Sequence, residues 1–172
     1  GLKSSEHIGK IIVDPRNPDT VWVAAQGPLW SAGGERGLYR TTDGGKTWKK
    51  VYQSNRPYET TWKVSFPTAN MGYATIQSYN PDTTVKQQRI AKTTDGGLTW
   101  FEIDLVEDAN ARQFGIGFLN ENHGFVGTMN SGYETRDGGR SWTPVNLGKA
   151  CNKIRIYREL DGSYYGYAIG VD

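Results

Sequence analysis

Apolar residues alternate with polar ones, or form short runs, along most of this 172-residue chain, and Gly, Pro, Asn and Asp separate the segments. A period of two is typical of β-strands, and the 3.6-residue period of an amphipathic helix is missing. The pattern predicts strands at residues 7–14, 20–26, 37–42, 47–53, 60–66, 71–77, 87–93, 99–105, 113–119, 123–129, 132–136, 141–147, 152–158 and 164–171.

One eight-residue stretch occurs three times, as TTDGGKTW at 41–48, TTDGGLTW at 93–100 and TRDGGRSW at 135–142. Successive copies are 52 and then 42 positions apart. A period of about 40–50 residues with β-type sequence is typical of propeller blades, each a four-stranded sheet. Every copy falls between the third and fourth predicted strands of a blade. The sequence therefore predicts an all-β fold, a β-propeller segment of about 3.5 four-stranded blades.

We expect one propeller segment over residues 1–172. Its blades are predicted at about 7–53, 60–105 and 113–147, followed by a partial blade at 152–171.

The repeated stretch has the chemistry of a tight hairpin. Its two Gly residues supply positive φ angles, and its Asp and Thr or Ser oxygens can accept hydrogen bonds from turn N–H groups. Its Trp can cover the neighbouring hairpin or blade. We expect a structural role for these members: Thr41, Asp43, Gly45, Thr47, Trp48, Thr93, Asp95, Gly97, Thr99, Trp100, Thr135, Asp137, Gly139, Ser141 and Trp142.

The pattern Thr-x-Asp-x-Gly-x-Thr/Ser-Trp resembles the Asp-box, or BNR repeat, of sialidase-like and sortilin-like β-propellers. In that superfamily the motif lies on the face away from the binding site, so the resemblance implies a fold rather than an activity. Relatives with this repeat are mostly secreted, periplasmic or luminal, which implies a secreted or periplasmic location.

Two parts of the chain resemble different relatives. Residues 9–48 are similar to sortilin-like (Vps10-type) repeat proteins of bacteria, many of them labelled glycosyl hydrolases. The part from about Tyr58 onward, including 62–82, is more similar to relatives of photosystem II assembly factors. This difference suggests a fusion of two related fragments. The chain starts at Gly1 without Met, which suggests a processed product or a piece of a longer protein.

Composition and charge exclude several kinds of site and partner. The 20 basic and 18 acidic residues give a net charge of +2 and are dispersed, so no nucleic-acid surface is expected. No apolar stretch approaches the length of a membrane span. Cys151 is the only cysteine, which excludes an internal disulfide and a zinc site built on several thiolates.

The repeated turn does not match a cofactor motif. A phosphate-binding loop needs Gly where Arg40 stands, and the other copies replace Lys46 by Leu98 and Arg140. A calcium loop needs alternating oxygen ligands and a distal Glu, which are absent. We therefore expect no cofactor and no metal.

No catalytic residues are predicted. His7 and His123 stand far apart in the sequence and are expected to be packed or surface residues, and no G-x-S-x-G nucleophile motif occurs. Sialidase-like activity would require an arginine cluster, a Tyr–Glu pair and an F/Y-R-I-P motif, to which only NRPYE at 55–59 is faintly similar. Acids in predicted loops, which are usually just solvated, are Glu35, Glu59, Glu107 and Asp108.

Topology predicts where a binding site lies. With the repeated hairpins on one face, the other loops gather on the opposite face, namely residues 26–36, 54–59, 78–86, 106–112, 128–131 and 148–151. Aromatic residues mixed with Arg are typical of protein or carbohydrate contact surfaces. The alternative, which has equal weight, is that these side chains are ordinary loop residues without a binding role. The candidates are Trp30, Glu35, Arg36, Arg56, Tyr58, Tyr79, Asp108 and Arg112.

These observations favour a non-catalytic scaffold or binding module for a protein or glycan partner. The alternatives are a fragment of an extracellular glycoside hydrolase with its catalytic acids on other blades, and an assembly factor for a membrane complex. The partial blade has only two strands, and residues 1–6 are too short and polar to complete it. Because exposed strand edges and apolar faces pair with other chains, we expect self-association, or completion by another polypeptide, burying about 1,600 Å² or more.

Overall fold

The structure, a computed structural model, describes residues 1–29 and 33–171. The strands of the first sheet are β1 (Ile8–Asp14), β2 (Asn17–Ala25), β3 (Gly37–Thr41) and β4 (Lys49–Tyr52). Those of the second are β5 (Glu59–Ser65), β6 (Gly72–Ser78), β7 (Gln87–Thr93) and β8 (Phe101–Glu107). Those of the third are β9 (Gln113–Phe118), β10 (Gly124–Thr128), β11 (Gly132–Thr135) and β12 (Thr143–Val145). A last hairpin contains β13 (Lys149–Arg158) and β14 (Tyr164–Val171).

Each sheet is an antiparallel meander in which neighbouring strands follow one another in the chain. Three four-stranded sheets and a two-stranded one confirm the all-β fold and the 3.5-blade propeller segment. In the described part of the chain, no helix is long and apolar enough to cross a membrane.

Strand boundaries depart from the expectation where side chains shape a turn. β2 begins at Asn17, three residues early, because Asp14 closes a two-residue turn by accepting hydrogen bonds from the backbone N–H and the guanidinium of Arg16. The Trp of each repeated hairpin stands just before the outer strand, whereas the predicted strands at 47–53, 99–105 and 141–147 include it. Trp100, for example, still belongs to the turn, since its Nε1 donates to the carbonyl of Gly97 at 3.3 Å.

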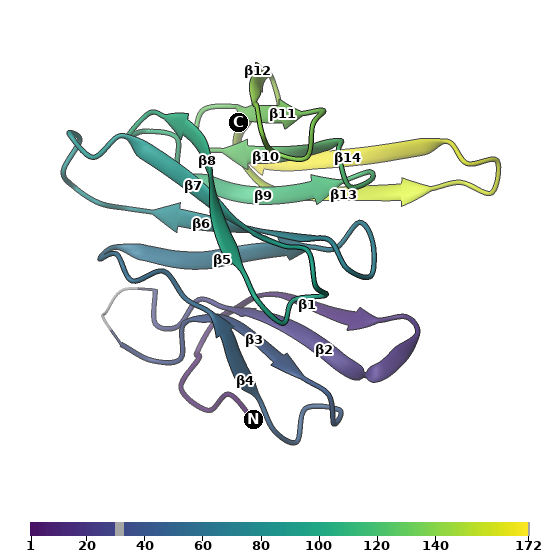
Figure 1. Cartoon of the computed structure of the whole chain (residues 1–172). Helices are drawn as coiled ribbons and strands as arrows, with labels where there is room; N and C mark the ends of the chain where they lie inside the picture. The colour runs from purple at the N-terminus through teal and green to yellow at the C-terminus, as the bar shows by residue number, and fades with distance from the viewer. Residues whose placement is uncertain (30–32, 172) are drawn as a thin grey trace.

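The sheets stack on one another in chain order, and the core lies between them (Figure 1). Between the first and second sheets, the Trp22 and Phe66 rings have centroids 4.6 Å apart. Between the second and third, Tyr73 stacks on Phe118 at 3.7 Å with the ring planes 3° apart. The strands β1, β5, β9 and β13 form the inner edges of the four sheets and contact one another in succession.

The three repeated hairpins share one hydrogen-bond pattern. In the second copy, Thr93 Oγ1 donates to Asp95 Oδ1 at 2.8 Å and accepts from the N–H of Gly97 at 3.0 Å. The N–H of Thr99 donates to Asp95 Oδ1 at 3.0 Å, and its hydroxyl donates to Oδ2 at 2.6 Å. The first and third copies repeat these contacts. One carboxylate therefore holds both sides of each turn.

The second glycine of the motif also lets the neighbouring sheet approach. Gly97 has a φ of 79°, a conformation that favours glycine. A Cβ atom on Gly97 would lie 2.4 Å from Nε1 of Trp22 in the first sheet. In the third copy, a Cβ on Gly139 would lie 2.5 Å from Cδ1 of Ile103 in the second sheet. Glycine at this position is therefore favoured both by the turn conformation and by the close approach of the neighbouring sheet.

Replacing Asp95 by Ala removes hydrogen bonds on both sides of its turn, and we expect the free energy of unfolding to fall by about 1–3 kcal/mol. Urea denaturation measures this change. The matched control is Asp104→Ala, since Asp104 is 74% exposed and makes only a surface ion pair with Arg89. That pair contributes at most about 1 kcal/mol. Equal losses in the two variants would contradict a structural role for the carboxylate of the repeated hairpin.

The same carboxylates predict an acid-sensitive stability. Hydrogen bonds from the hydroxyl and then the N–H of Thr99 lower the pKa of Asp95 to about 2, and Ser141 lowers the pKa of Asp137 to about 2 in the same way. A pKa that is lower in the folded state adds stability above the unfolded-state pKa, and this stability disappears as the pH falls through the folded value. We expect the difference in melting temperature between the wild type and Asp95→Asn to shrink between about pH 4 and about pH 2. A difference that stays constant over this range would contradict the assignment.

Candidate functional site

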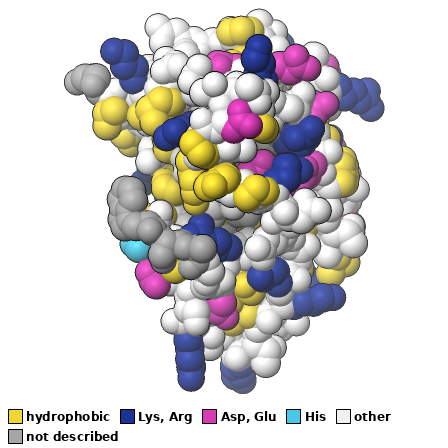
Figure 2. Space-filling view, turned by 90° about the vertical axis from the view of Figure 1, so that its left-hand side faces the viewer, with side chains coloured by type: hydrophobic (Ala, Val, Ile, Leu, Met, Phe, Trp, Pro, Cys, Tyr) yellow, Lys and Arg dark blue, Asp and Glu magenta, His cyan; other side chains and the backbone are white. Residues whose placement is uncertain are grey.

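The antiparallel meanders place two kinds of connection at opposite ends of the stacked sheets (Figure 1). The repeated hairpins lie at one end, together with the turns that join the first and second strands of each sheet. The longer loops that join the second to the third strand, and one sheet to the next, lie at the other end. We call the latter the loop end. Figure 2 faces this end and shows hydrophobic side chains gathered among Lys and Arg.

A cavity of about 210 Å³ opens at the loop end. Its walls combine aromatic, aliphatic and polar side chains, namely Leu29, Trp62, Gln77, Tyr79, Arg112 and Phe114. Trp62 of β5 and Phe114 of β9 meet edge to face with ring centroids 5.8 Å apart. The cavity therefore lies where the second and third sheets adjoin.

Arginines flank this cavity. Arg36 donates from Nη1 to the hydroxyl of Tyr79 at 3.1 Å, which joins the loop after β2 to the loop after β6. Arg112 is an exposed lining residue immediately before β9. The structure thus brings three of the predicted residues, Arg36, Tyr79 and Arg112, to one place.

Tyr58 is held beside this group in a strained backbone conformation. Its φ is 62°, which is uncommon for a residue with a Cβ, and its side chain is 52% exposed. Its carbonyl accepts a hydrogen bond from the N–H of Tyr79 at 3.0 Å. Backbone strain of this kind tends to cluster at functional sites.

The other predicted residues take local partners. Glu35 accepts a hydrogen bond from the N–H of Ser4 at 2.7 Å. Asp108 accepts one from the N–H of Asn110 at 2.8 Å. Neither lines the loop-end cavity. Trp30 lies outside the described residues.

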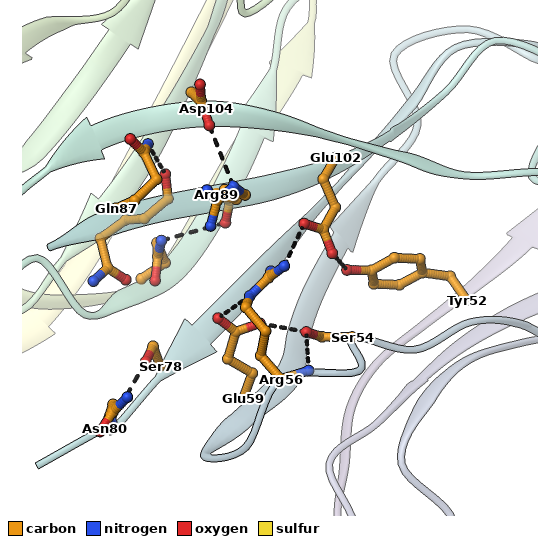
Figure 3. A network of polar contacts seen from close by, with 12 residues as sticks. Tyr52, Ser54, Arg56, Glu59, Ser78, Asn80, Gln87, Arg89, Glu102 and Asp104 are labelled. Carbon is orange, nitrogen blue, oxygen red and sulfur yellow. Dashed lines mark hydrogen bonds and ion pairs between the residues drawn. The ribbon is translucent and has the colours of Figure 1, made fainter. Parts of the chain in front are cut away.

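Arg56 is the centre of a polar network that joins the first and second sheets (Figure 3). It donates from Nε to Glu59 at 2.8 Å and pairs through Nη1 with Glu102 of β8 at 2.8 Å. Tyr52 of β4 donates its hydroxyl to Glu102 at 2.7 Å, and Ser54 donates to Glu59. Burial, followed by the bond to Glu102, raises the pKa of Tyr52, and the bond to Glu59 raises that of Arg56. The network fixes the base of the loop that carries Tyr58.

This network does not have the electrostatics of a glycosidase acid. Burial alone would raise the pKa of Glu102, but the hydrogen bonds from Arg56 and Tyr52, together with the charges of Arg56 and Arg89, lower it. A carboxylic acid that protonates a glycosidic oxygen needs a raised pKa. Over residues 1–29 and 33–171, no three His, Cys, Asp or Glu side chains form a group that could hold a metal ion.

Sequence reasoning missed Trp62 and Phe114. Both were assigned only to predicted strands, where an aromatic residue is usual. The available signal was that each is an aromatic residue in the first strand of a blade, Trp62 in β5 and Phe114 in β9.

No protein-family profile and no curated protein matches the chain. Solved structures do resemble it. YCF48 bound to D1 peptide has a TM-score of 0.61 at 23% identity, over 95% of this chain and 48% of that one. YCF48 from Cyanidioschyzon merolae has a TM-score of 0.59 at 20% identity, over 95% and 51%. The Niastella koreensis GH74 enzyme has a TM-score of 0.61 at 16% identity, over 96% and 26%.

Identities this low show the fold alone, which is that of a β-propeller. The chain spans about half the length of the YCF48 structures and about a quarter of the GH74 enzyme.

Proposed function

We propose that this chain is a non-catalytic propeller segment that binds a protein partner at its loop end. The observation that carries the proposal is the cavity walled by Trp62, Phe114 and Tyr79, with Arg36 bonded to Tyr79 and Arg112 at the rim. Trp, Tyr and Arg are the side chains that contribute most binding free energy in protein interfaces.

Two further features support a protein partner. Tyr58 presents an exposed ring from a strained loop that the Arg56 network fixes, so little conformational entropy remains to be lost on binding. A propeller of similar fold, YCF48, has been solved with a D1 peptide bound. That likeness favours a peptide segment as ligand and agrees with a role as an assembly factor.

A fragment of a glycoside hydrolase is the second candidate. The likeness to a GH74 enzyme favours it. The lowered pKa of Glu102 and the pairing of Glu59 with Arg56 oppose acid catalysis by these two carboxylates. On this alternative, the catalytic acids belong to blades outside the present sequence.

Peptides selected against the wild-type chain from a random displayed library test the proposal. In the variant Tyr79→Ala with Arg112→Ala, we expect the Kd of the selected peptides to rise about 30-fold or more, since interface hot spots contribute about 2 kcal/mol or more each. Titration calorimetry measures the Kd, and melting temperatures confirm that the variant folds.

The control variant carries Leu98→Ala and Arg140→Ala, which truncate exposed side chains in two Asp-box hairpins at the opposite end. The control should leave the Kd unchanged. Equal loss of affinity in both variants would contradict a loop-end site. Turnover of aryl glycosides by the wild-type chain would favour the glycoside hydrolase instead.

We also propose that another propeller segment, such as a second copy of this chain, completes the structure along β14. One edge of β14 pairs with β13, and its other edge has no strand partner within the described residues. All residues of β14 are exposed, and Tyr165, Tyr167, Ile169 and Val171 alternate along one face. Such edges are templates for pairing with another strand. Two segments of this length also equal about one YCF48 chain.

Light scattering should give the wild-type chain a mass at least twice the 19.2 kDa of a monomer. Tyr167→Lys with Ile169→Lys should reduce the mass to that of a monomer, because charges along an edge strand oppose pairing. The control, Val85→Lys with Leu98→Lys, adds the same charges to exposed apolar positions elsewhere and should not change the mass. A wild-type monomer that persists at high concentration would contradict the proposal.

A further inference from the structure

Four cations from three inner-edge strands surround one cavity. Lys10 lies on β1, Lys63 on β5, and Lys153 and Arg155 on β13. With the apolar side chains of Ile12, Val64 and their neighbours, they line a space of about 380 Å³, which is within the usual range for small-ligand sites. No carboxylate is among the lining residues in the described part of the chain.

The four cations are close enough to repel one another. Burial lowers the pKa of Lys10, and the charges of Arg155, Lys153 and Lys63 lower it further. Burial likewise lowers the pKa of Lys63, followed by the charges of Lys153 and Arg155. No acidic group contributes to the pKa shift of Lys10 or of Lys63. The site therefore concentrates positive charge without compensation from the described residues.

Most of these cationic side chains make no hydrogen bond within the described residues and are therefore available to bind a ligand. Lys63 donates from Nζ to the carbonyl of Gly9 at 2.7 Å, which fixes its ammonium group between β5 and β1. The side chains of Lys10, Lys153 and Arg155 make no hydrogen bond or ion pair with another described residue, although their backbones pair within the sheets. Arg56 and Arg89, by contrast, are paired with carboxylates. Donors that converge on a cavity without acceptors are what an anion requires.

Protection of strand edges is the simpler explanation, since lysines on edge strands discourage unwanted pairing. β9 is an inner-edge strand too, and its sequence QFGIGF carries no charge. Charge is thus absent from one of the four edges. The cations instead come from the strands on either side of β9 and converge on one space, which edge protection does not require.

We propose that this cavity binds a small multivalent oxyanion, held by Lys10, Lys63, Lys153 and Arg155. Such a ligand would replace the repulsion between the cations by charge-assisted hydrogen bonds, which are the stronger class of hydrogen bond in proteins. Phosphate and carboxylate groups share this chemistry. The site lies along the inner edges of the sheets and does not depend on the protein-binding role of the loop end.

Titration calorimetry of the 172-residue chain with sodium tripolyphosphate, and separately with citrate, tests the proposal. We expect saturable binding of at least one of the two anions at one site per chain, weakening as salt is added. The stronger ligand assigns the phosphate or the carboxylate class. The variant Lys10→Gln with Lys153→Gln should weaken binding at least about tenfold, because each lost hydrogen bond to a charged group weakens binding by about that factor or more.

The matched control is Lys49→Gln with Lys50→Gln on β4, which removes the same charge from an exposed outer strand. It should bind the anion as the wild type does. Equal weakening in both variants would show non-specific attraction and overturn the proposal. Failure of both anions to bind, even where an acidic peptide binds, would overturn it as well.

Thermal melting without ligand gives a second measurement. Removing Lys10 and Lys153 relieves repulsion, so the melting temperature should stay the same or rise. A lower melting temperature with unchanged anion affinity would assign these lysines a packing role and overturn the site. If the double variant does not fold, Arg155→Gln alone, at an exposed position, should still weaken anion binding.

Discussion

Stacking between neighbouring sheets is the interaction on which this fold depends, because a single four-stranded meander cannot bury both of its faces. Tyr73 shows how closely stacking and turn structure are joined. Its ring lies on Phe118 of the next sheet, and its hydroxyl donates to the carbonyl of Glu121 and approaches that of Gly138. Lys92 donates to the same Gly138 carbonyl. The repeated hairpin of the third sheet is therefore a docking point for the second sheet.

The features that the sequence predicts well are local. Asp95, Gly97 and Thr99 lie within five positions of one another, so their turn chemistry is visible in the sequence, and the spacing of its copies gives the blades. β2 begins earlier than the sequence pattern predicts because Asp14 binds Arg16. The alternation of apolar residues gives no sign of this contact.

The candidate sites were harder to predict because they join residues that are distant in sequence. Tyr52 and Glu102 stand 50 positions apart, and Lys10 and Arg155 come from opposite ends of the chain. Because charged residues are spread evenly along the sequence, the sequence gives no sign of a cavity lined by cations. The cavity forms only when these strands pack side by side in the folded chain. Topology alone did place the loops that carry Arg36, Tyr79 and Arg112 at one end.

The strictly sequential meander has a consequence for how the chain acquires its structure. Every strand ladder joins neighbours in the chain, and each sheet stacks on the one made before it. During synthesis, a blade can therefore form as soon as its four strands have left the ribosome and can offer its face as a template to the next. Within the described residues, no strand has to wait for a partner that is distant in the chain.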